Sequence, residues 1–462
     1  MKKVVFLISL IGLSIASANA THNRAGYISY THISGLSYEV EITTYTVADS
    51  PAERPALTLE WGDGDMDTIL RTNGGGNGVL LSNGTKENKY LAQHTFPSLG
   101  SYVLSMEDPN RNGGVLNVPN SINVPFSIQS ELRITGSNGS NNSVRTSTSM
   151  NFDAAFGVPF SQNLAFYDLD ADFLTFELAT PRGADGKVIS GYSVPNGVSV
   201  NPLNGDFVWN APQQQGEYNF AILVKEFRTG ELVGSVVVDF QVAVLPEVFI
   251  GVLGGTNAWP TNNVGDLALT VQPNEAIDLN LNYADANADS VSLNAYGEPF
   301  LLGNTSAFDL DSASINHEAR NFRWTPSISN VRCAPYIVSF RGTSNGHLST
   351  DVSLLIYVHD QSILSDPDCM VFAGIGEEEL DGSARVNFFP NPFSETASVT
   401  FSSENVFDFT FEVFNGSGQL VHSESGSTQR TVELNEHFAS GLYFYKASFS
   451  DGKIEQGKVV VQ

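Results

Sequence analysis

Short runs of alternating apolar and polar residues recur along the whole chain, separated by glycine, asparagine, proline and aspartate, and no segment shows sustained helical periodicity. Because successive side chains of a strand point to opposite faces, such runs are typical of strands with one buried face. Their spacing is typical of antiparallel sandwiches. A chain of 462 residues is too long for one hydrophobic core, and its length indicates roughly three to four domains. The sequence therefore predicts an all-β protein of tandem β-sandwich domains.

Two segments in the middle of the chain repeat each other. Each contains an acidic run, a strand with a tryptophan and a strand with an early tyrosine: Asp168 to Asp172, Trp209 and Tyr218 in one, and Asp285 to Asp289, Trp324 and Tyr336 in the other. Corresponding features lie about 115 residues apart, and a repeat of that length is a whole sandwich rather than a solenoid unit. The sequence predicts one domain at 131–246 and its repeat at 247–360. The Ser/Asn-rich stretch 137–143 is expected to be a loop or linker.

The N-terminus has the pattern of a signal peptide. A basic start, an apolar run from Val4 to Ile15 and the tripeptide Ala18-Asn-Ala20 predict cleavage after residue 20, with a mature chain that begins at Thr21. The apolar run is too short to span a bilayer, and no later run approaches the ~20 apolar residues that a transmembrane helix needs. No cysteine follows the small residues, which excludes a lipoprotein anchor.

The C-terminal segment 384–462 carries an ordered series of short motifs. A Pro-Asn-Pro precedes alternating residues, a Gly-x-Gly turn separates two apolar runs, and Gly-x-Tyr-x-Tyr precedes a terminal Lys-Val-Val strand. This series resembles the type A sorting domain of the type IX secretion system, a β-sandwich found in Bacteroidota. The resemblance implies export through the periplasm and outer membrane to the cell surface or beyond, with the secretion machinery as a partner. The matching motif residues are Pro390, Asn391, Pro392, Gly441, Tyr443 and Lys458.

The first mature segment, 21–130, contains Trp61-Gly-Asp-Gly, His94-Thr-Phe and Gly-Ser-Tyr102. These motifs resemble those of PKD domains, which are Ig-like sandwiches. The resemblance implies that Trp61 packs in the core, that Asp63 and Asp65 are turn residues, and that His94 belongs to the packed pattern and is a core histidine rather than a ligand. The strands from Gly26 to Val47 fit this pattern less well and are expected to form an N-terminal extension.

The acidic runs are the candidate metal sites. The first copy of the repeat, about 150–245, combines Asp-x-Asp-x-Asp, Pro-x-Gly and Asn-Gly turns, a Trp strand and Gly-x-Tyr. It resembles the cadherin-like, putative-Ig domains of bacterial surface proteins, in which such a run often binds calcium between neighbouring domains. The resemblance implies the possible calcium ligands Asp168, Asp170, Asp172, Asp285, Asn287 and Asp289. The alternative is a solvated acidic turn whose side chains cap backbone N–H groups, because neither run continues as an EF-hand.

Cys333 and Cys369 are the two cysteines of the chain. An exported protein meets oxidising conditions, so a disulfide is one expectation and two free buried thiols are the other. The disulfide would close a loop of about 35 residues and contribute about 3–4 kcal/mol. It would tie the acidic linker 361–383 back to the domain before it.

The remaining features argue for binding rather than catalysis. A formal charge of −27 repels phosphate backbones, which disfavours nucleic acid; it also attracts divalent cations and keeps a protein soluble. No nucleophile elbow or zincin pattern is found, so the sequence predicts no catalytic residues and no organic cofactor. Trp61, Trp209 and Trp324 lie in strands and are expected in the core, whereas Trp259 lies in an expected loop and is the candidate glycan contact.

The sequence thus predicts an exported, non-catalytic adhesin or matrix protein of the cell surface. Its Ig-like domains would form a rod that calcium stiffens at the junctions, and its loops would contact an extracellular protein, cell-surface or polysaccharide ligand. The alternative hypothesis is a polysaccharide-binding protein that supports extracellular glycan degradation.

Overall fold

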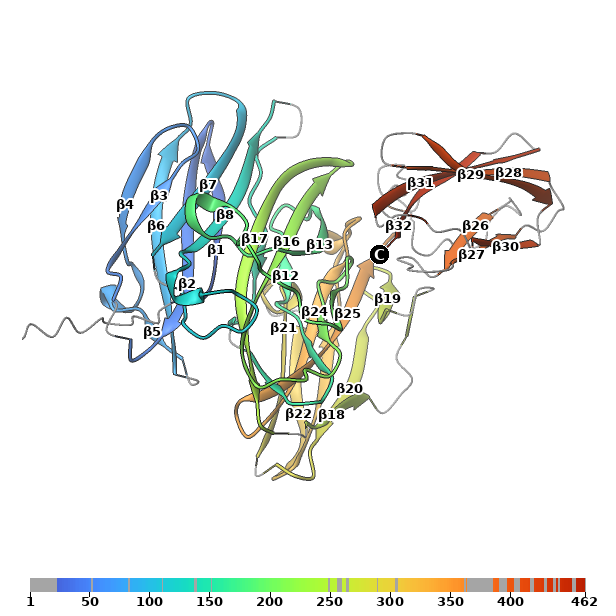
Figure 1. Ribbon diagram of the computed structural model, residues 1–462. Coiled ribbons are helices and arrows are strands. Elements are labelled where there is room, and N and C mark those ends of the chain that lie inside the picture. The colour runs from blue at the N-terminus through green and yellow to red at the C-terminus, as the bar shows by residue number, and fades with distance from the viewer. Residues whose placement is uncertain are drawn as a thin grey trace, which may run out of the picture. The chain divides into compact units, whose positions relative to one another are not determined.

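The structure is a computed structural model in which the chain divides into two compact units, Met1–Gly376 and Glu377–Gln462 (Figure 1). In the larger unit it describes residues 23–50, 53–81, 84–109, 111–136, 139–150, 152–247, 250–255, 260–262, 266–288, 290–303, 306–360 and 363. In the C-terminal unit it describes residues 385–389, 397–402, 408–415, 419–427, 430–434, 438, 441–450 and 454–461. The predicted signal peptide and almost all of the predicted acidic linker lie outside these ranges.

Every named element is a strand or a short 3-10 helix, which confirms the predicted all-β fold class. Among the described residues, no helix has the length and apolar character that crossing a membrane requires.

The first sandwich spans residues 23–134 and has two facing sheets with the orders β1-β2-β6-β5 and β4-β3-β7-β8. Its elements are β1 (Asn23–Ser34), β2 (Ser37–Val47), β3 (Ala56–Glu60), β4 (Met66–Leu70), η1 (Asn73–Gly76), β5 (Val79–Leu80), β6 (Thr85–Thr95), β7 (Gly100–Asp108), η2 (Ser121–Asn123) and β8 (Phe126–Ile134). β1 and β2 supply Tyr30 and Tyr38 to the core that contains Trp61, Phe96 and Tyr102. They are therefore part of this sandwich, and the expectation of an N-terminal extension is corrected.

The second sandwich spans residues 145–245. Its elements are β9 (Arg145–Thr146), β10 (Phe152–Ala155), β11 (Phe160–Gln162), β12 (Phe166–Tyr167), β13 (Phe173–Ala179), η3 (Ala184–Gly186), β14 (Val198–Val200), β15 (Phe207–Trp209), β16 (Gly216–Arg228) and β17 (Glu231–Leu245). One sheet has the order β13-β16-β17-β10, with β10 parallel to β17, and the other has the order β11-β15-β14. A small ladder of β9 and β12 lies beside them.

The third sandwich spans residues 252–358 and repeats this arrangement. Its elements are β18 (Val252–Gly255), β19 (Ala268–Val271), β20 (Ile277–Ala284), β21 (Val291–Gly297), η4 (Glu298–Phe300), β22 (Ser306–Ser314), β23 (His317–Trp324), η5 (Ile328–Asn330), β24 (Tyr336–Ser344) and β25 (Leu348–Val358). One sheet has the order β21-β24-β25-β19, with β19 parallel to β25, and the other has the order β18-β20-β23-β22.

The same aromatic contact lies at the same place in both copies. Trp209 meets Tyr218 edge-on at 4.8 Å between ring centroids, and Trp324 meets Tyr336 edge-on at 4.8 Å. The structure thus gives the two repeated segments the same strand order in one sheet and the same core contact, whereas the other sheet of the third sandwich has the additional strand β18. The exact boundaries at 130, 246 and 360 stay predictions.

β17 joins the first two sandwiches into one sheet (Figure 1). Its first part pairs with β8, where Gly234 lies opposite Leu132, and its middle pairs with β1, where Asp239 lies opposite Gly26. Its last part pairs with β10, and β10 in turn meets β25 of the third sandwich. The sandwiches therefore lie edge to edge in a continuous sheet. The expectation of a rod of domains stiffened at its junctions is wrong for the described part of residues 23–360, because the sandwiches are joined by strand pairing along their edges.

Buried ion pairs support these contacts. Arg111 of the first sandwich donates to both carboxylate oxygens of Asp239 on β17, at 3.2 and 2.9 Å, and both residues are fully buried. Arg341 on β24 donates to both oxygens of Asp351 at 2.8 and 2.7 Å, and also to Thr148 and Asn163 of the second sandwich. Each guanidinium thus satisfies a buried carboxylate beside a neighbouring sandwich, which is the arrangement in which a buried charge is tolerated.

The C-terminal unit is a smaller pair of sheets. Its strands are β26 (Arg385–Phe389), β27 (Ala397–Ser402), β28 (Asp408–Asn415), β29 (Leu420–Ser427), β30 (Arg430–Leu434), β31 (Gly441–Phe449) and β32 (Ile454–Val461). The sheet orders are β26-β27-β30 and β29-β28-β31-β32, with a core that includes Phe401, Phe411 and Tyr443.

Candidate functional site

The acidic run of the second sandwich forms a tight loop between β12 and β13. One oxygen of Asp168, Oδ1, accepts the backbone N–H groups of both Asp170 and Asp172, each at 2.9 Å. Ala171 between them has φ of 62°, which a tight turn of this kind requires. Asp168 and Asp172 are buried, and the ligand atoms of the three aspartates lie within 4.8 Å of one another. The structure therefore brings the first predicted set of ligands together.

An arginine already lies among these carboxylates. Arg228, the last residue of β16, donates from Nε and Nη2 to the two oxygens of Asp172 at 2.7 and 2.6 Å. The same Nη2 lies 3.0 Å from Oδ2 of Asp170. Both oxygens of Asp170 also accept hydrogen bonds from Asn142, one from its backbone and one from its side chain, each at 2.7 Å. The guanidinium thus supplies the positive charge that a metal ion would otherwise supply.

A buried glutamate adds a further carboxyl group behind the loop. Glu226 on β16 is fully buried and accepts hydrogen bonds from the backbone of Val144, from Asn141 at 2.9 Å and from the Tyr30 hydroxyl at 3.4 Å. Burial raises the pKa of Glu226 well above its usual range, and the charge of Asp168 raises it further. The first and second sandwiches therefore meet at a carboxyl group that is costly to ionise.

One oxygen of the cluster has no partner. Within the part of the chain that the structure describes, Oδ2 of Asp168 is buried and forms no hydrogen bond. Burial raises the pKa of Asp168 to about 7, and the charges of Asp172 and Asp170 add to the effect while the turn N–H groups oppose it. Asp168 and Asp172 also line a cavity of about 10 Å³, beside Arg332 and Pro335 of the third sandwich, which is space for about one water molecule.

We expect the Asp168→Asn variant to be more stable than the wild-type chain at pH 8, with chelator present. The folded pKa lies above the unfolded value of about 3.9, so the folded chain binds more protons between about pH 4 and pH 7. The stability of the wild type should therefore fall as pH rises through this window, whereas the asparagine side chain of the variant keeps the turn hydrogen bonds and cannot ionise. The difference should be on the order of 2–4 kcal/mol at pH 8 and should shrink at pH 5.

Urea unfolding at the two pH values measures this difference. Asp185→Asn is the matched control, because Asp185 is exposed and its carboxylate pairs with Lys187 at the surface. Equal pH dependence of the wild type and the Asp168 variant would contradict the expected cost of ionising Asp168.

The carboxylate of Asp285 in the second acidic run has different hydrogen-bond partners from that of Asp168. Oδ1 of Asp285 accepts the N–H of Asn287 at 2.9 Å, as in the first loop, but its Oδ2 accepts the Ser344 hydroxyl at 2.6 Å. Asn287 is exposed, and Asp289 lies outside the described residues. Among the described residues, groups of three or more metal-ligating side chains occur at Asp168–Asp172 and at Asp63, Asp65 and His94, and not here.

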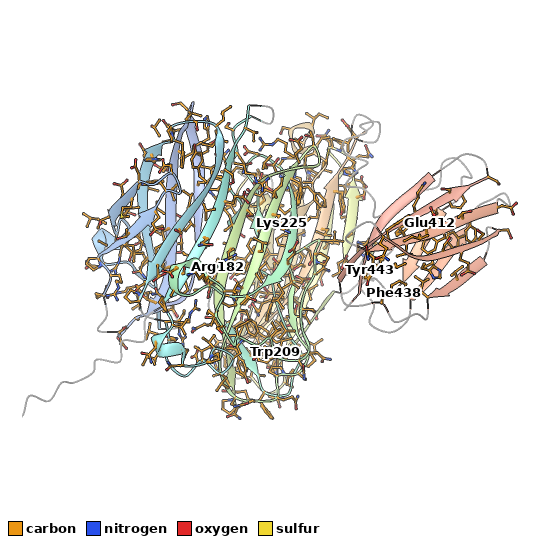
Figure 2. All side chains as sticks on the ribbon, turned by 45° about the horizontal axis from the view of Figure 1, so that its top comes forward. Arg182, Trp209, Lys225, Glu412, Phe438 and Tyr443 are labelled. Carbon is orange, nitrogen blue, oxygen red and sulfur yellow. The ribbon has the colours of Figure 1, made fainter. Side chains whose placement is uncertain are left out.

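The predicted tryptophan positions are partly visible. Trp61, Trp209 and Trp324 are each at most 1 % exposed, which confirms their core role, and Figure 2 shows Trp209 among packed side chains. Trp259 lies outside the described residues, so its glycan contact stays a prediction.

Cys333 is disulfide-bonded; Cys369, the other cysteine of the chain, lies outside the described residues, so the pairing stays a prediction.

The sorting motifs are partly described. Tyr443 is buried in the core of the C-terminal unit and meets Phe438 edge-on at 5.3 Å (Figure 2). Gly441 begins β31, and Lys458 lies on β32 opposite Phe444. Pro390, Asn391 and Pro392 lie outside the described residues. The tyrosine of the motif thus has a structural role in the fold of this unit.

Residues 387–462 match the family of secretion system C-terminal sorting domains. The C-terminal segment is a type IX sorting domain. It marks the chain for handling by the type IX secretion machinery and for export to the cell surface or the extracellular space. No curated protein matches the chain.

Several solved structures show a distant likeness. The four N-terminal Ig domains of Dscam1 isoform 8.4 are 10 % identical, with 95 % of this chain and 99 % of that chain covered and a TM-score of 0.20. Protocadherin gamma B2 cadherin domains 1–5 are 14 % identical, with 94 % and 78 % covered and a TM-score of 0.17. The ectodomain of mouse nectin-like molecule 4 is 10 % identical, with 68 % and 97 % covered and a TM-score of 0.16. Such low TM-scores support no conclusion about arrangement or function.

Proposed function

We propose that the chain is an exported, non-catalytic binding protein, an adhesin or matrix component that acts at the cell surface. The observation that carries the proposal is a sorting domain attached to three sandwiches that share one continuous sheet. Strand pairing across β17 and the buried pairs Arg111–Asp239 and Arg341–Asp351 hold these sandwiches in one compact unit. Three sandwiches joined in this way, called the body below, present fixed loops and sheet faces to a partner, so that binding costs little conformational entropy.

The polar clusters favour a structural role over catalysis. Asp172 and Asp170 are held by Arg228, and Asp239 and Asp351 by their own arginines. The cavity beside Asp168, at about 10 Å³, is too small for a sugar or a peptide. A glycosidase needs two carboxyl groups across a cleft that admits the substrate. The buried carboxylates of residues 23–358 therefore favour packing, charge balance or ion binding over catalysis.

Binding of the tag-free full-length chain to immobilised glycans, matrix proteins and whole cells tests this function. Saturable binding to cells or proteins supports the adhesin. Saturable binding to a polysaccharide supports the alternative role in extracellular glycan use and makes Trp259→Ala the next variant. Breakdown of any substrate in the panel contradicts a non-catalytic role.

Calcium remains the proposed ligand of the Asp168 loop, in competition with Arg228. A calcium ion takes six to eight oxygen ligands, and Arg228 holds the two oxygens of Asp172 and one of Asp170. We therefore expect weak calcium binding by the wild type and binding roughly tenfold tighter by Arg228→Gln, because the site gains free carboxylate oxygens. Calcium titration followed by melting temperature measures this, with Asp168→Asn/Asp170→Asn as the variant that should lose any response. Equal responses of Arg228→Gln and the double variant would contradict a calcium site here.

A further inference from the structure

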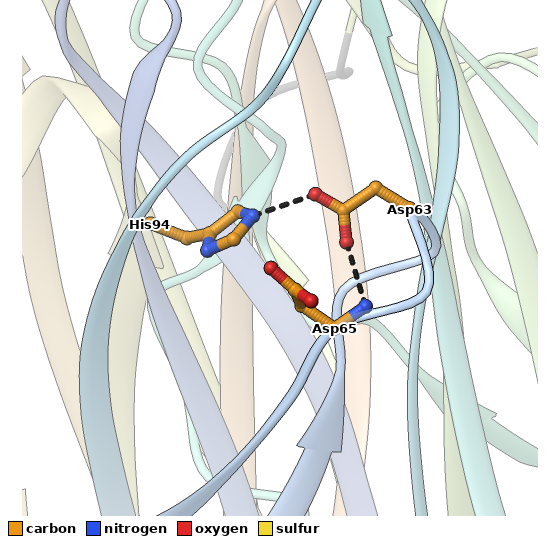
Figure 3. Close-up of side chains that lie close together, drawn as sticks. All are labelled: Asp63, Asp65 and His94. Atoms are coloured by element: carbon orange, nitrogen blue, oxygen red, sulfur yellow. Dashed lines mark hydrogen bonds and ion pairs between the residues drawn. The ribbon is translucent and has the colours of Figure 1, made fainter.

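Three metal-ligating side chains meet at the surface of the first sandwich. Asp63 and Asp65 lie in the turn between β3 and β4, and His94 lies near the end of β6 (Figure 3). One ligand atom from each residue lies within 4.8 Å of the other two. Nε2 of His94 is 2.7 Å from Oδ2 of Asp63, and Oδ1 of Asp63 accepts the Asp65 N–H at 3.0 Å (Figure 3). Residues 31 positions apart in the chain thus form one small group.

The surrounding core holds this group in place. The His94 ring stacks on Trp61 with centroids 4.5 Å apart and planes at 15°, and it meets Phe96 edge-on at 4.9 Å. The turn depends on Gly62, whose φ is 82° and at which a Cβ would lie 2.6 Å from the backbone nitrogen of Val103. Imidazole and carboxylate are therefore oriented before any ligand arrives, as the residues around a metal ligand commonly are.

No lysine or arginine among the described residues balances the charges of the group, although His94 pairs with Asp63 at 2.7 Å. Among the described residues, neither Asp63 nor Asp65 forms an ion pair with lysine or arginine, and the Asp65 carboxylate accepts no hydrogen bond. This differs from the Asp168 loop, where Arg228 lies between the carboxylates. Asp65 is also exposed, whereas the side chain of Asp63 is 6 % exposed and that of His94 is 14 % exposed. The group is thus open to solvent on the side of Asp65.

We propose that Asp63, Asp65 and His94 bind a divalent transition-metal ion, with zinc as the expected ion. One imidazole nitrogen with two carboxylate oxygens is a ligand set that suits zinc and its neighbours, whereas calcium is bound by oxygen atoms alone. Bonds of ~2.0–2.2 Å to a shared ion require the His94 to Asp63 contact to widen by ~0.5 Å. The exposed Asp65 carboxylate needs only to turn toward the ion. Three protein ligands leave a position for water or for a donor group of a partner molecule.

Without a bound ion, the same three residues are held by the hydrogen bonds of the turn. The sequence predicted Asp63 and Asp65 as turn residues and His94 as a core histidine, and the Asp63–Asp65 bond and the His94 stacking agree with those roles. A bound ion would replace the His94 to Asp63 hydrogen bond and leave the Trp61 stacking in place. The site therefore adds a ligand to the PKD-like turn without a change in its fold.

Calorimetric titration of the tag-free full-length chain with zinc chloride tests the proposal. Asp65→Asn is the informative variant, because the Asp65 side chain supports no other described contact and its loss should not unfold the turn. Glu60→Gln is the matched control, since it removes one negative charge from the neighbouring exposed end of β3. The wild type and Glu60→Gln should bind one zinc ion with similar affinity, and Asp65→Asn should bind it at least about tenfold more weakly.

Cobalt gives a second readout, because its absorption spectrum reports coordination by nitrogen and oxygen atoms. The cobalt spectrum should be lost in both Asp65→Asn and His94→Gln and kept in Glu60→Gln. The proposal is overturned if the wild type binds no zinc, if Asp65→Asn binds zinc as tightly as the wild type, or if Glu60→Gln weakens binding to the same extent as Asp65→Asn.

Discussion

Replacing Arg111 with methionine is expected to cost about 3–5 kcal/mol of folding stability, because it leaves Asp239 buried and charged without its partner. Asp239 is fully buried, and burial already raises its pKa despite the nearby guanidinium. Without Arg111, Asn219 remains as a donor to Asp239 at 2.8 Å. One amide hydrogen bond cannot replace two charge-assisted bonds to a buried carboxylate. The loss should appear as a lower midpoint of urea unfolding.

Two further variants separate the charge from the packing. Arg111→Met/Asp239→Asn should recover much of the lost stability, since removing both charges avoids an unpaired one. Arg323→Met is the surface control. Arg323 pairs with Asp278 and Asp309 at 3.2 Å, but all three side chains are at least half exposed, so no resolvable change is expected. An Arg111→Met chain as stable as the wild type would show that this pair does not hold the first two sandwiches together.

Pattern and spacing were sufficient to predict the strands and the aromatic core. Trp209 and Trp324 occupy matching places in the repeat because an alternating strand with one buried face leaves a large apolar side chain no other position. These assignments depend on local periodicity, which a single sequence contains.

The joining of the sandwiches could not be read from the sequence. β17 pairs with β8, β1 and β10 along successive parts of its length, and these pairings depend on which strand edges are free after each sandwich has formed. The alternation of apolar residues in β17 predicts which face of the strand is buried. It does not predict which other strand pairs with its edge. The rod was therefore expected, and the continuous sheet was not.

The acidic site was only half predicted. The aspartates were found by their spacing, but Arg228, Glu226 and the Asn141–Asn142 pair were missed. The stretch 137–143 was predicted as loop or linker, and its described residues 139–143 lie in no strand or helix. What the prediction missed is that Asn141 and Ser143 are buried and pair with Glu226 and Tyr30. One signal was present: with 23 Lys and Arg against 50 Asp and Glu, an arginine at the end of an apolar strand is expected to pair with a carboxylate.

Removal of residues 384–462 is expected to stop export while the body still folds. The sorting domain is a compact unit with its own core, and the described residues of 23–358 form separate hydrophobic cores of their own. The truncated chain should therefore lose its export signal but still fold, so that it accumulates in the periplasm. Tyr443→Ala is the matched point variant: it empties a buried position in the sorting domain, for which we expect about 2–4 kcal/mol of local destabilisation and partial retention.

Adhesion requires that the body reach the outside of the cell, and the location of the truncated chain tests this most directly. Cells that produce the full-length or the truncated chain are fractionated, and intact cells are treated with protease. The full-length chain should be found at the surface or in the medium and be cleaved by the protease, whereas the chain that ends at residue 383 should be found in the periplasm and be protected. A truncated chain that appears outside the cell in the same amount as the full-length chain would contradict the assignment of residues 387–462 as the export signal.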